Sequence, residues 1–205
     1  MIRTFWGNPG CGKTTLACKF ALKNQKRYKG TVTNFPQSVP GSSYYESLDQ
    51  LGDWKPPRGF WCGWDESGID FNNRDHKHMS KACVAFHKKH RHELLDIDCF
   101  SQSWEDIDVT LRRLSVELWY MMRLGPWTLC RRVYKRTGID KDTHQIVDQY
   151  KFANMLWLFI WPLQLGWPFQ KKFTLTYRPF YYKYFDSFDS IPVPVREPCF
   201  NPKKH

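Results

Sequence analysis

The 205-residue sequence predicts an α/β fold with a mainly parallel central sheet flanked by helices, and three stretches predict it. A short β-prone run, MIRTFW, leads into a glycine-rich loop and then into a segment with apolar residues at helical spacing. The nearly continuous apolar run at 60–64 is typical of a strand buried on both faces of a parallel sheet. A third strand is expected at 95–100, where apolar and polar residues alternate.

Length and composition indicate one domain with a tail. A chain of 205 residues is long enough for one sizeable core and too short for two ordinary domains joined by a linker. Because 41% of the residues are hydrophobic and 17% are aromatic, we expect a packed core and exclude general disorder. We expect the core at 1–150, an aromatic-rich β or irregular extension of the same domain at 151–190, and a flexible proline-rich tail at 191–205.

The net charge of +11 and the isoelectric point near 9.4 predict an anionic partner. Nucleic acid, phospholipid head groups and a nucleotide all fit, and the sign of the charge does not choose among them. Seven cysteines without a C-x-x-C pair, and the lack of a secretory signal, favour a reducing cytoplasm.

The loop at 7–15 matches the pattern G-x-x-x-x-G-K-[ST] of phosphate-binding loops, and it stands between a strand and a helix as that pattern requires. Its backbone N–H groups are expected to surround the phosphates of ATP. Lys13 would reach the β- and γ-phosphate oxygens, and the Thr14 hydroxyl would bind Mg²⁺. The expected nucleotide-binding residues are Gly7, Asn8, Pro9, Gly10, Cys11, Gly12, Lys13, Thr14 and Thr15.

An acidic pair, Asp65 and Glu66, follows the apolar run at 60–64 and supplies the second half of a nucleotide site. Asp65 is expected to hold Mg²⁺ at the end of a strand that neighbours the loop. Glu66 is the more informative residue, since a second carboxylate there can polarise a water molecule for attack on the γ-phosphate. A surface acidic pair at a strand end is the alternative.

Gln102 follows the strand expected at 95–100 and is the candidate sensor of the γ-phosphate. Ser103 then resembles a helix N-cap, and apolar residues recur every three or four positions after it. We therefore expect an amphipathic helix over 104–124 that Gly125 and Pro126 end.

Three arginines are candidates for a finger that completes the nucleotide site of a neighbouring subunit. Arg74 and Arg91 flank the two expected strand ends, and Arg112 lies on the expected helix. Taken alone, each is more simply interpreted as a surface charge.

The stretch CVAFHKKHRH places Cys83, His87, His90 and His92 close together, so a zinc site has to be considered. Cys83 and His87 are four residues apart on an expected helix, as ligands can be, but no second cysteine pair exists and lysines crowd the cluster. A basic helix face that meets phosphates is the favoured interpretation.

The apolar stretch at 155–169, MLWLFIWPLQLGWPF, raises the question of a membrane. As a helix it would reach about 22 Å, short of the roughly 30 Å of a hydrocarbon core, and prolines and a glycine interrupt it. A buried hairpin packed with tryptophans and an interfacial or re-entrant loop both stay open.

With these motifs placed, the chain resembles the zonula occludens toxin (Zot) family, the assembly ATPases of filamentous phages. The resemblance covers nearly the whole chain. It rests on the N-terminal phosphate loop, on DESGIDFNNRD with Phe71 and Arg74, on HKKHRH, and on DIDCFSQS with Gln102. The segment DIDVTLRRL and the aromatic closing motif YYKYFDSFD at 181–189 complete it. The loop alone is common to many families, whereas the combination is much more specific.

The resemblance implies a RecA-like P-loop NTPase that forms a homo-oligomeric ring in the cytoplasm of an infected bacterium, at the inner membrane. It implies ATP and Mg²⁺ as cofactors, and a motor that drives extrusion of single-stranded DNA while coat protein is added. Longer relatives continue into a membrane span, whereas this chain ends at NPKKH. Peripheral contact with the membrane, or docking on a phage membrane protein, is therefore expected, with basic helices gripping the DNA backbone.

Two other functions are compatible with the phosphate loop. A P-loop nucleotide kinase would fit the length and the scattered arginines, but a kinase has no need of an acid at Glu66. A nucleotide-gated membrane scaffold would need binding without turnover. A GTPase switch is disfavoured because the guanine-reading pattern N-K-x-D is absent.

Overall fold

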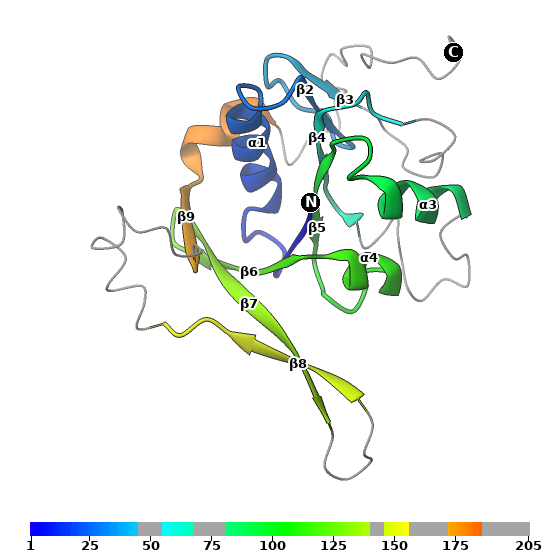
Figure 1. Ribbon diagram of the computed structural model, residues 1–205. Coiled ribbons are helices and arrows are strands. Elements are labelled where there is room, and N and C mark those ends of the chain that lie inside the picture. Colours follow the sequence, from blue (N-terminus) through cyan, green and yellow to red (C-terminus); the bar gives the residue numbers. More distant parts are fainter. Residues whose placement is uncertain (45–54, 68–80, 140–145, 156–171, 186–205) are drawn as a thin grey trace.

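A computed structural model describes residues 1–44, 55–67, 81–139, 146–155 and 172–185 (Figure 1). Its strands are β1 (Ile2–Trp6), β2 (Gly30–Thr33), β3 (Ser42–Tyr44), β4 (Phe60–Trp64), β5 (Asp96–Ser101), β6 (Glu117–Leu124), β7 (Trp127–Ile139), β8 (Ile146–Phe152) and β9 (Phe173–Tyr177). Its helices are α1 (Lys13–Asn24), α3 (Lys81–Lys89), α4 (Val109–Leu114) and the 3₁₀ helix η2 (Pro179–Tyr184).

Six strands form the parallel part of one sheet, in the order β3-β2-β4-β5-β1-β6. β5 lies between β1 and β4, and its register pairs Phe100 with Phe5 and Cys99 with Trp64. The carboxyl ends of these three strands therefore meet at one end of the sheet. The mainly parallel sheet expected from the sequence is confirmed, and so are the three strands that predicted it.

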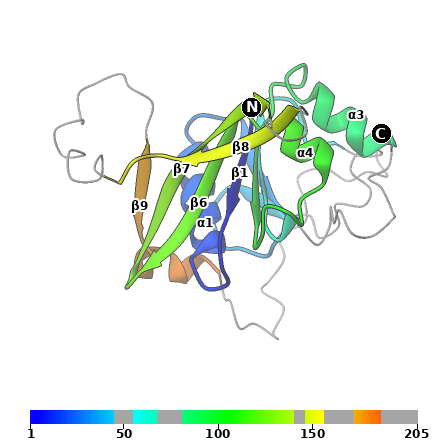
Figure 2. The ribbon, with the colours of Figure 1, turned by 90° about the horizontal axis from the view of Figure 1, so that it is seen from below.

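Three further strands extend the sheet in the antiparallel sense. β6 and β7 form a hairpin whose turn contains Gly125 and Pro126, and β7 is long enough to pair with two partners along its far side. β9 pairs with Trp127 to Arg131, and β8 pairs with Val133 to Ile139. Figure 2 shows β6, β7 and β8 continuing the sheet past β1, and in Figure 1 the β7–β8 ribbon extends away from the helices.

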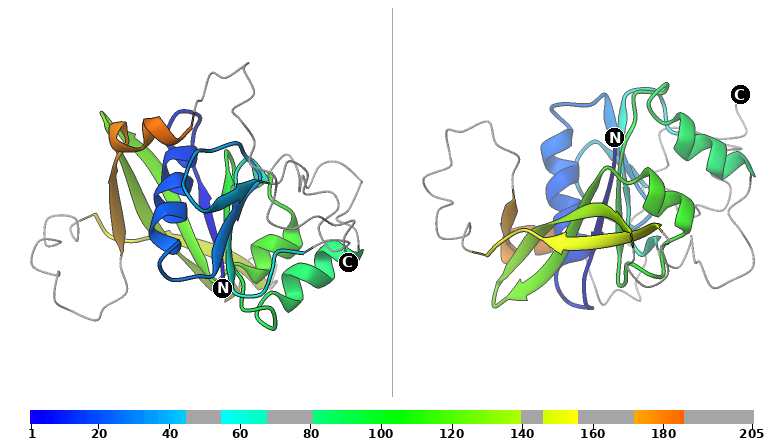
Figure 3. Two further views of the ribbon diagram at one scale, coloured as in Figure 1. Left: turned by 90° about the horizontal axis from the view of Figure 1, so that it is seen from above. Right: turned by 60° about the horizontal axis from the view of Figure 1, so that its bottom comes forward.

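Helices cover both faces of the parallel part, with α1 on one face and α3 and α4 on the other (Figures 1 and 3). Side chains alternate along each strand, so Ile97 and Cys99 of β5 join the core under α3 and α4, whereas Phe100 joins the core under α1. The core under α3 and α4 consists of Ile2, Val32, Cys62, Trp64, Cys83, Phe86, Leu95, Ile97, Cys99, Ile107 and Leu111.

The hydrogen bonds of Asp98 explain how an acidic residue can stand in the middle of β5. Its carboxylate is fully buried, and it accepts hydrogen bonds from Arg3 Nε at 2.6 Å and from Trp61 Nε1 at 2.8 Å. A buried charge is tolerated when it is paired and hydrogen-bonded in this way. β5 is therefore buried on both faces even though polar and apolar residues alternate along it.

The prediction of one helix over 104–124 is wrong. α4 is a short helix, Val109–Leu114, and its cap is Asp108, whose carboxylate accepts the N–H of Thr110 at 2.6 Å. β6 follows at Glu117–Leu124 and pairs with both β1 and β7. The apolar residues of this stretch fit helical spacing, but its aromatic residues also fit a strand, and pairing within the sheet decided between the two.

The helix expected around Cys83 and His87 is present as α3, but its histidines do not form a basic face. His87 and His90 are buried, and burial lowers the pKa of His87 to about 4, so this imidazole is neutral at physiological pH. Its Nδ1 is 2.9 Å from the carbonyl oxygen of Cys83. The exposed cations of the helix are Lys81, Lys88 and Lys89. Among the described residues no group of histidine, cysteine and carboxylate side chains is arranged to hold a metal ion.

Within the described ranges, no helix has both the length and the apolar character that crossing a bilayer would need. Residues 156–169 of the apolar stretch, the motif residues Phe71 and Arg74, and the tail at 191–205 lie outside the described residues. The expectations placed on them therefore stay predictions.

Candidate functional site

The phosphate loop connects β1 to α1 at the carboxyl end of the sheet. Gly10 and Gly12 have φ angles of +73° and +94°, which residues with a Cβ atom rarely adopt. A Cβ atom on Gly12 would also lie 2.9 Å from Arg178 Cδ and closer still to Thr128 Oγ1. Glycine at position 12 is thus required by backbone conformation and by the side chains packed around it.

The start of α1 leaves backbone donors for an anion. Its first backbone hydrogen bond runs from Leu16 N–H to Gly12 O at 3.0 Å, so the N–H groups of Lys13, Thr14 and Thr15 have no partner within the helix. Lys13 is only 7% exposed, and its ammonium group donates to Gly7 O at 3.0 Å. Backbone dipoles and an ammonium group thus gather on one loop, as binding of a polyphosphate requires.

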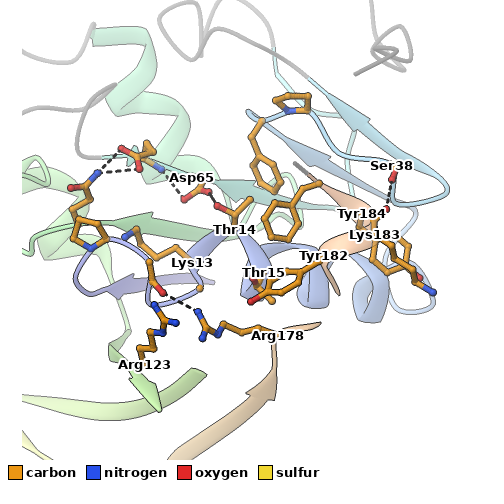
Figure 4. Close-up of a pocket in the computed structure, with 18 residues that line it drawn as sticks. Lys13, Thr14, Thr15, Ser38, Asp65, Arg123, Arg178, Tyr182, Lys183 and Tyr184 are labelled. Carbon is orange, nitrogen blue, oxygen red and sulfur yellow. Dashed lines mark hydrogen bonds between the residues drawn. The ribbon is translucent and has the colours of Figure 1, made fainter. Parts of the chain in front are cut away.

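Thr14 and Asp65 meet across the end of the sheet, where the Thr14 hydroxyl donates to Asp65 Oδ2 at 2.6 Å (Figure 4). Asp65 follows β4, which β5 separates from β1, so the carboxylate comes from the strand beyond the nearest neighbour. The carboxylate is 6% exposed, and no lysine, arginine or histidine of the described residues forms an ion pair with it.

The electrostatics of Asp65 favour a cation. Burial raises the pKa of its carboxyl, while hydrogen bonds from the Thr14 hydroxyl and the Glu66 N–H lower it. A divalent cation beside the carboxylate would stabilise its ionised form further. Hydroxyl and carboxylate oxygens are ligands that Mg²⁺ prefers, so the two side chains fit the ion that the sequence predicts here.

Asn34, at the end of β2, holds Asp65 in place. Its side chain donates from Nδ2 to Asp65 O at 2.8 Å and accepts the Asp65 N–H at 2.7 Å through Oδ1. The sequence analysis did not find this residue. Only its position after a strand marks it, and that signal is too common to identify a functional side chain.

Glu66 and Gln102 are brought together by the pairing of β4 with β5. Gln102 Nε2 is 3.2 Å from both carboxylate oxygens of Glu66. Glu66 has a φ of +51°, a left-handed conformation that is uncommon for residues other than glycine and concentrates at functional sites. The structure therefore places the two polar residues expected to face a γ-phosphate side by side.

Residues of the phosphate loop, together with Asp65, Glu66 and Gln102, line a cavity of about 1110 Å³ that extends past the loop. Its walls also contain residues that the sequence analysis did not assign. They come from the segment after β2, from the end of β6, and from the segment after β9: Phe35, Pro36, Ser38, Arg123, Arg178, Tyr182, Lys183, Tyr184 and Phe185. Of these residues, only Tyr182, Lys183, Tyr184 and Phe185 had a signal in the sequence. They belong to the aromatic closing motif at 181–189, to which the sequence analysis assigns no role.

The closing segment is tied to the rest of the site by hydrogen bonds. Ser38 N–H donates to Tyr184 O at 2.8 Å, and Ser38 Oγ donates to Lys183 O at 3.3 Å. The phosphate loop is also bound to the sheet, since Thr128 Oγ1 of β7 donates to Cys11 O at 2.6 Å. Figure 4 shows Arg123, Arg178 and Tyr182 among the side chains that line the cavity together with Lys13 and Thr15.

The two candidate arginine fingers that the structure describes, Arg91 and Arg112, are not brought to the site of their own chain. Arg91 is exposed in the turn before β5, at the opposite end of the sheet from the loop. The guanidinium carbon of Arg112 lies 5.9 Å from the centre of the Trp104 ring, and Arg112 does not line the cavity. Arg74 is outside the described residues. Action of any of them on a neighbouring subunit stays a prediction.

No protein-family model and no curated protein sequence matches the chain. Among solved structures, the N-terminal domain of zonular occludens toxin from Neisseria meningitidis is similar at 19% identity and a TM-score of 0.53, over 76% of this chain and 96% of that domain. The genome packaging NTPase B204 from Sulfolobus turreted icosahedral virus 2, solved with AMP, has 11% identity and a TM-score of 0.48, over 72% and 96%. The flagellar accessory protein FlaH from Methanocaldococcus jannaschii has 13% identity and a TM-score of 0.45, over 72% and 88%.

The similarity to the zonular occludens toxin domain shows the fold of this chain. In this chain β5, which Gln102 follows, separates the strand of the phosphate loop from the strand of Asp65. The resemblance to the Zot family, stated from the motifs, is thereby confirmed at the level of fold. The chain has a mainly parallel, RecA-like α/β fold with a phosphate loop after β1, and it shares this fold with the N-terminal domain of zonular occludens toxin.

Proposed function

We propose that the chain binds ATP with Mg²⁺ in this cavity and hydrolyses the γ-phosphate. The observation that carries the proposal is the contact between Thr14 and Asp65, made in a cavity that Lys13 and Glu66 also line. Two chain segments fifty residues apart thus place a hydroxyl, a carboxylate, an ammonium group and a second carboxylate around one loop.

Each residue has a distinct role in the proposed reaction. Thr14 and Asp65 would hold Mg²⁺, which when bound neutralises charge on the phosphates. Lys13 binds the β- and γ-phosphate oxygens. Glu66 accepts a proton from the water that attacks the γ-phosphorus, and the bond to the bridging oxygen breaks to release ADP and phosphate. Gln102, held against Glu66, detects the γ-phosphate by exchanging that contact for a phosphate oxygen.

We further propose that hydrolysis drives export of single-stranded DNA during assembly of a filamentous phage. The protein would act as a ring in the bacterial cytoplasm, peripherally at the inner membrane, with phage membrane and coat proteins as partners. Support for this finer proposal comes from the fold shared with a zonular occludens toxin domain, from the family motifs, and from the net charge of +11.

A turnover assay tests the proposal and separates it from a nucleotide kinase. Purified full-length protein is given ATP and Mg²⁺ with no small phosphate acceptor, and release of ADP and inorganic phosphate is measured with and without single-stranded DNA. Equal amounts of both products, increased by DNA, are the expected result. Turnover that requires a nucleoside monophosphate would contradict a motor and identify a kinase.

Binding to single-stranded DNA is expected to weaken steeply with salt, because the cationic surface would contact phosphates and release counterions. The affinity for oligonucleotides of two unrelated sequences, measured by fluorescence anisotropy, should fall about 10-fold or more between 50 and 200 mM salt and should not depend on the sequence. Binding that does not change with salt would argue against backbone contact.

Tyr182 is expected to support the adenine base. Its ring is 50% exposed in the wall of the cavity and lies 6.3 Å from the ring of Phe185. Replacing Tyr182 by alanine should weaken ATP binding about fivefold or more, in line with base–aromatic stacking, and should leave binding of inorganic tripolyphosphate unchanged. Tyr150→Ala, at a 38% exposed tyrosine of β8 outside the cavity, is the matched control. Equal losses for both ligands would refute a base-binding role.

Assembly into a ring is tested by light scattering with and without a non-hydrolysable ATP analogue. An oligomer that forms or tightens with the analogue supports an arginine contributed by a neighbouring subunit. A monomer under all conditions would remove that part of the mechanism.

A further inference from the structure

Arg178 is a buried cation beside the phosphate loop that lacks a carboxylate partner. It is 7% exposed, and among the described residues no aspartate or glutamate forms an ion pair with it. Arg132 is buried to a similar degree but forms an ion pair with Glu117 at 3.1 Å. Because a buried charge is costly unless it is paired, an unpaired guanidinium at this place suggests an anionic ligand that satisfies it.

The contacts of Arg178 point the guanidinium at the loop. Nη1 donates to Gly10 O at 3.0 Å, Nη2 donates to Gly125 O in the turn between β6 and β7, and Nε is buried without a hydrogen-bond partner. Its two hydrogen bonds are thus to neutral carbonyl oxygens, and its Nε donor is unused. Arginine donors bind phosphate more strongly than they bind a carbonyl group, and the planar fork matches phosphate geometry.

The position of Arg178 is set by elements far apart in the sequence. Its backbone N–H donates to Pro126 O at 3.0 Å, where β9 meets the turn of the β6–β7 hairpin. Its stem packs against Gly12, and the side chain lines the cavity together with Lys13 and Thr14 (Figure 4). The pairing of β9 with β7 therefore delivers a second cation to the loop that already carries Lys13.

We propose that Arg178 is a phosphate-binding residue that acts within its own chain. On nucleotide binding the guanidinium leaves the Gly10 carbonyl and donates to phosphate oxygens, while its contact with Gly125 links the nucleotide to the β6–β7 turn. The inference rests on the proposed nucleotide binding, and it needs no neighbouring subunit. It is therefore separate from an arginine finger contributed in trans.

The experiment compares ATP with adenosine, which lacks phosphates. Dissociation constants are measured for the full-length wild type, Arg178→Gln, Arg178→Lys and the buried control Arg132→Gln, using calorimetry for ATP and ligand-observed NMR for adenosine. Arg178→Gln should weaken ATP binding about 10-fold or more and adenosine binding less than twofold. Arg178→Lys should recover part of the loss, and Arg132→Gln should change both ligands alike.

A second measurement does not depend on the folding of the glutamine variant. In the wild-type protein the Nε–H resonance of Arg178, assigned by its absence from Arg178→Lys, should shift with ATP and not with adenosine. A loss that is equal for both ligands, or a resonance that does not respond to ATP, overturns the inference while nucleotide binding stands. A wild-type protein that binds neither ligand overturns the proposed function and the inference with it.

Discussion

Replacing Lys13 by alanine is expected to lower the rate of ATP hydrolysis at least about 100-fold, as removal of a preorganised charged donor from a transition state does. The ammonium group is buried in the loop and donates to the carbonyl of Gly7, so it is already positioned where phosphate oxygens would replace that carbonyl. The affinity for ATP should fall as well, because the lysine contacts the ground state too. Phosphate release and ATP titration calorimetry measure the two effects.

The control for this substitution is Lys23→Ala, at an exposed lysine in the last turn of the same helix. It removes an equal charge from α1 and should leave both hydrolysis and ATP affinity near the wild-type values. Hydrolysis that survives Lys13→Ala at more than a tenth of the wild-type rate would show that the measured activity arises elsewhere.

Glu66→Gln is expected to slow hydrolysis about 100-fold or more while ATP still binds, because a general base contributes about 10² to 10⁴ in rate. The amide keeps the size of the side chain and its contact with Gln102 but no longer accepts a proton. Single-turnover kinetics with ATP, together with calorimetry, separates the chemical step from binding. Glu105→Gln, at an exposed glutamate outside the cavity, is the matched control.

The same variant distinguishes the motor from a scaffold. If phage assembly proceeds at the wild-type level with Glu66→Gln in an infected cell, then binding suffices and the chain is a nucleotide-gated scaffold. If hydrolysis continues unchanged in vitro, then Glu66 is not the base. Loss of assembly together with retained ATP binding is the outcome that a motor requires.

Local sequence signals predicted the loop and the two carboxylates well. Glycines at 10 and 12 are required by positive φ angles, and the apolar run before Asp65 can be buried only as an internal strand. These are properties of a few consecutive residues, so a single sequence suffices to recognise them. The meeting of Thr14 with Asp65 followed from the motif, although the sequence did not predict that the strand expected at 95–100 would lie between β1 and β4.

Contacts made across the sheet could not be predicted in the same way. The stretch 117–124 becomes a strand because β1 and β7 offer partners on either side, and its own residues do not choose between helix and strand. Arg178 is 168 positions from Gly10, and no local pattern links the two residues. Asn34 was missed for the same reason, since its partner comes from another strand.

The pairing of β9 with the first half of β7 has a consequence for synthesis on the ribosome. The loop leaves the exit tunnel well before residues 172–185, so the wall that carries Arg178 and Tyr182 is added only after these later residues have emerged and paired with β7. A nascent chain halted before β9 would therefore expose a glycine loop with neither its second cation nor its aromatic side. The complete wall of the cavity thus forms only after β9 has been synthesised, well after the loop itself.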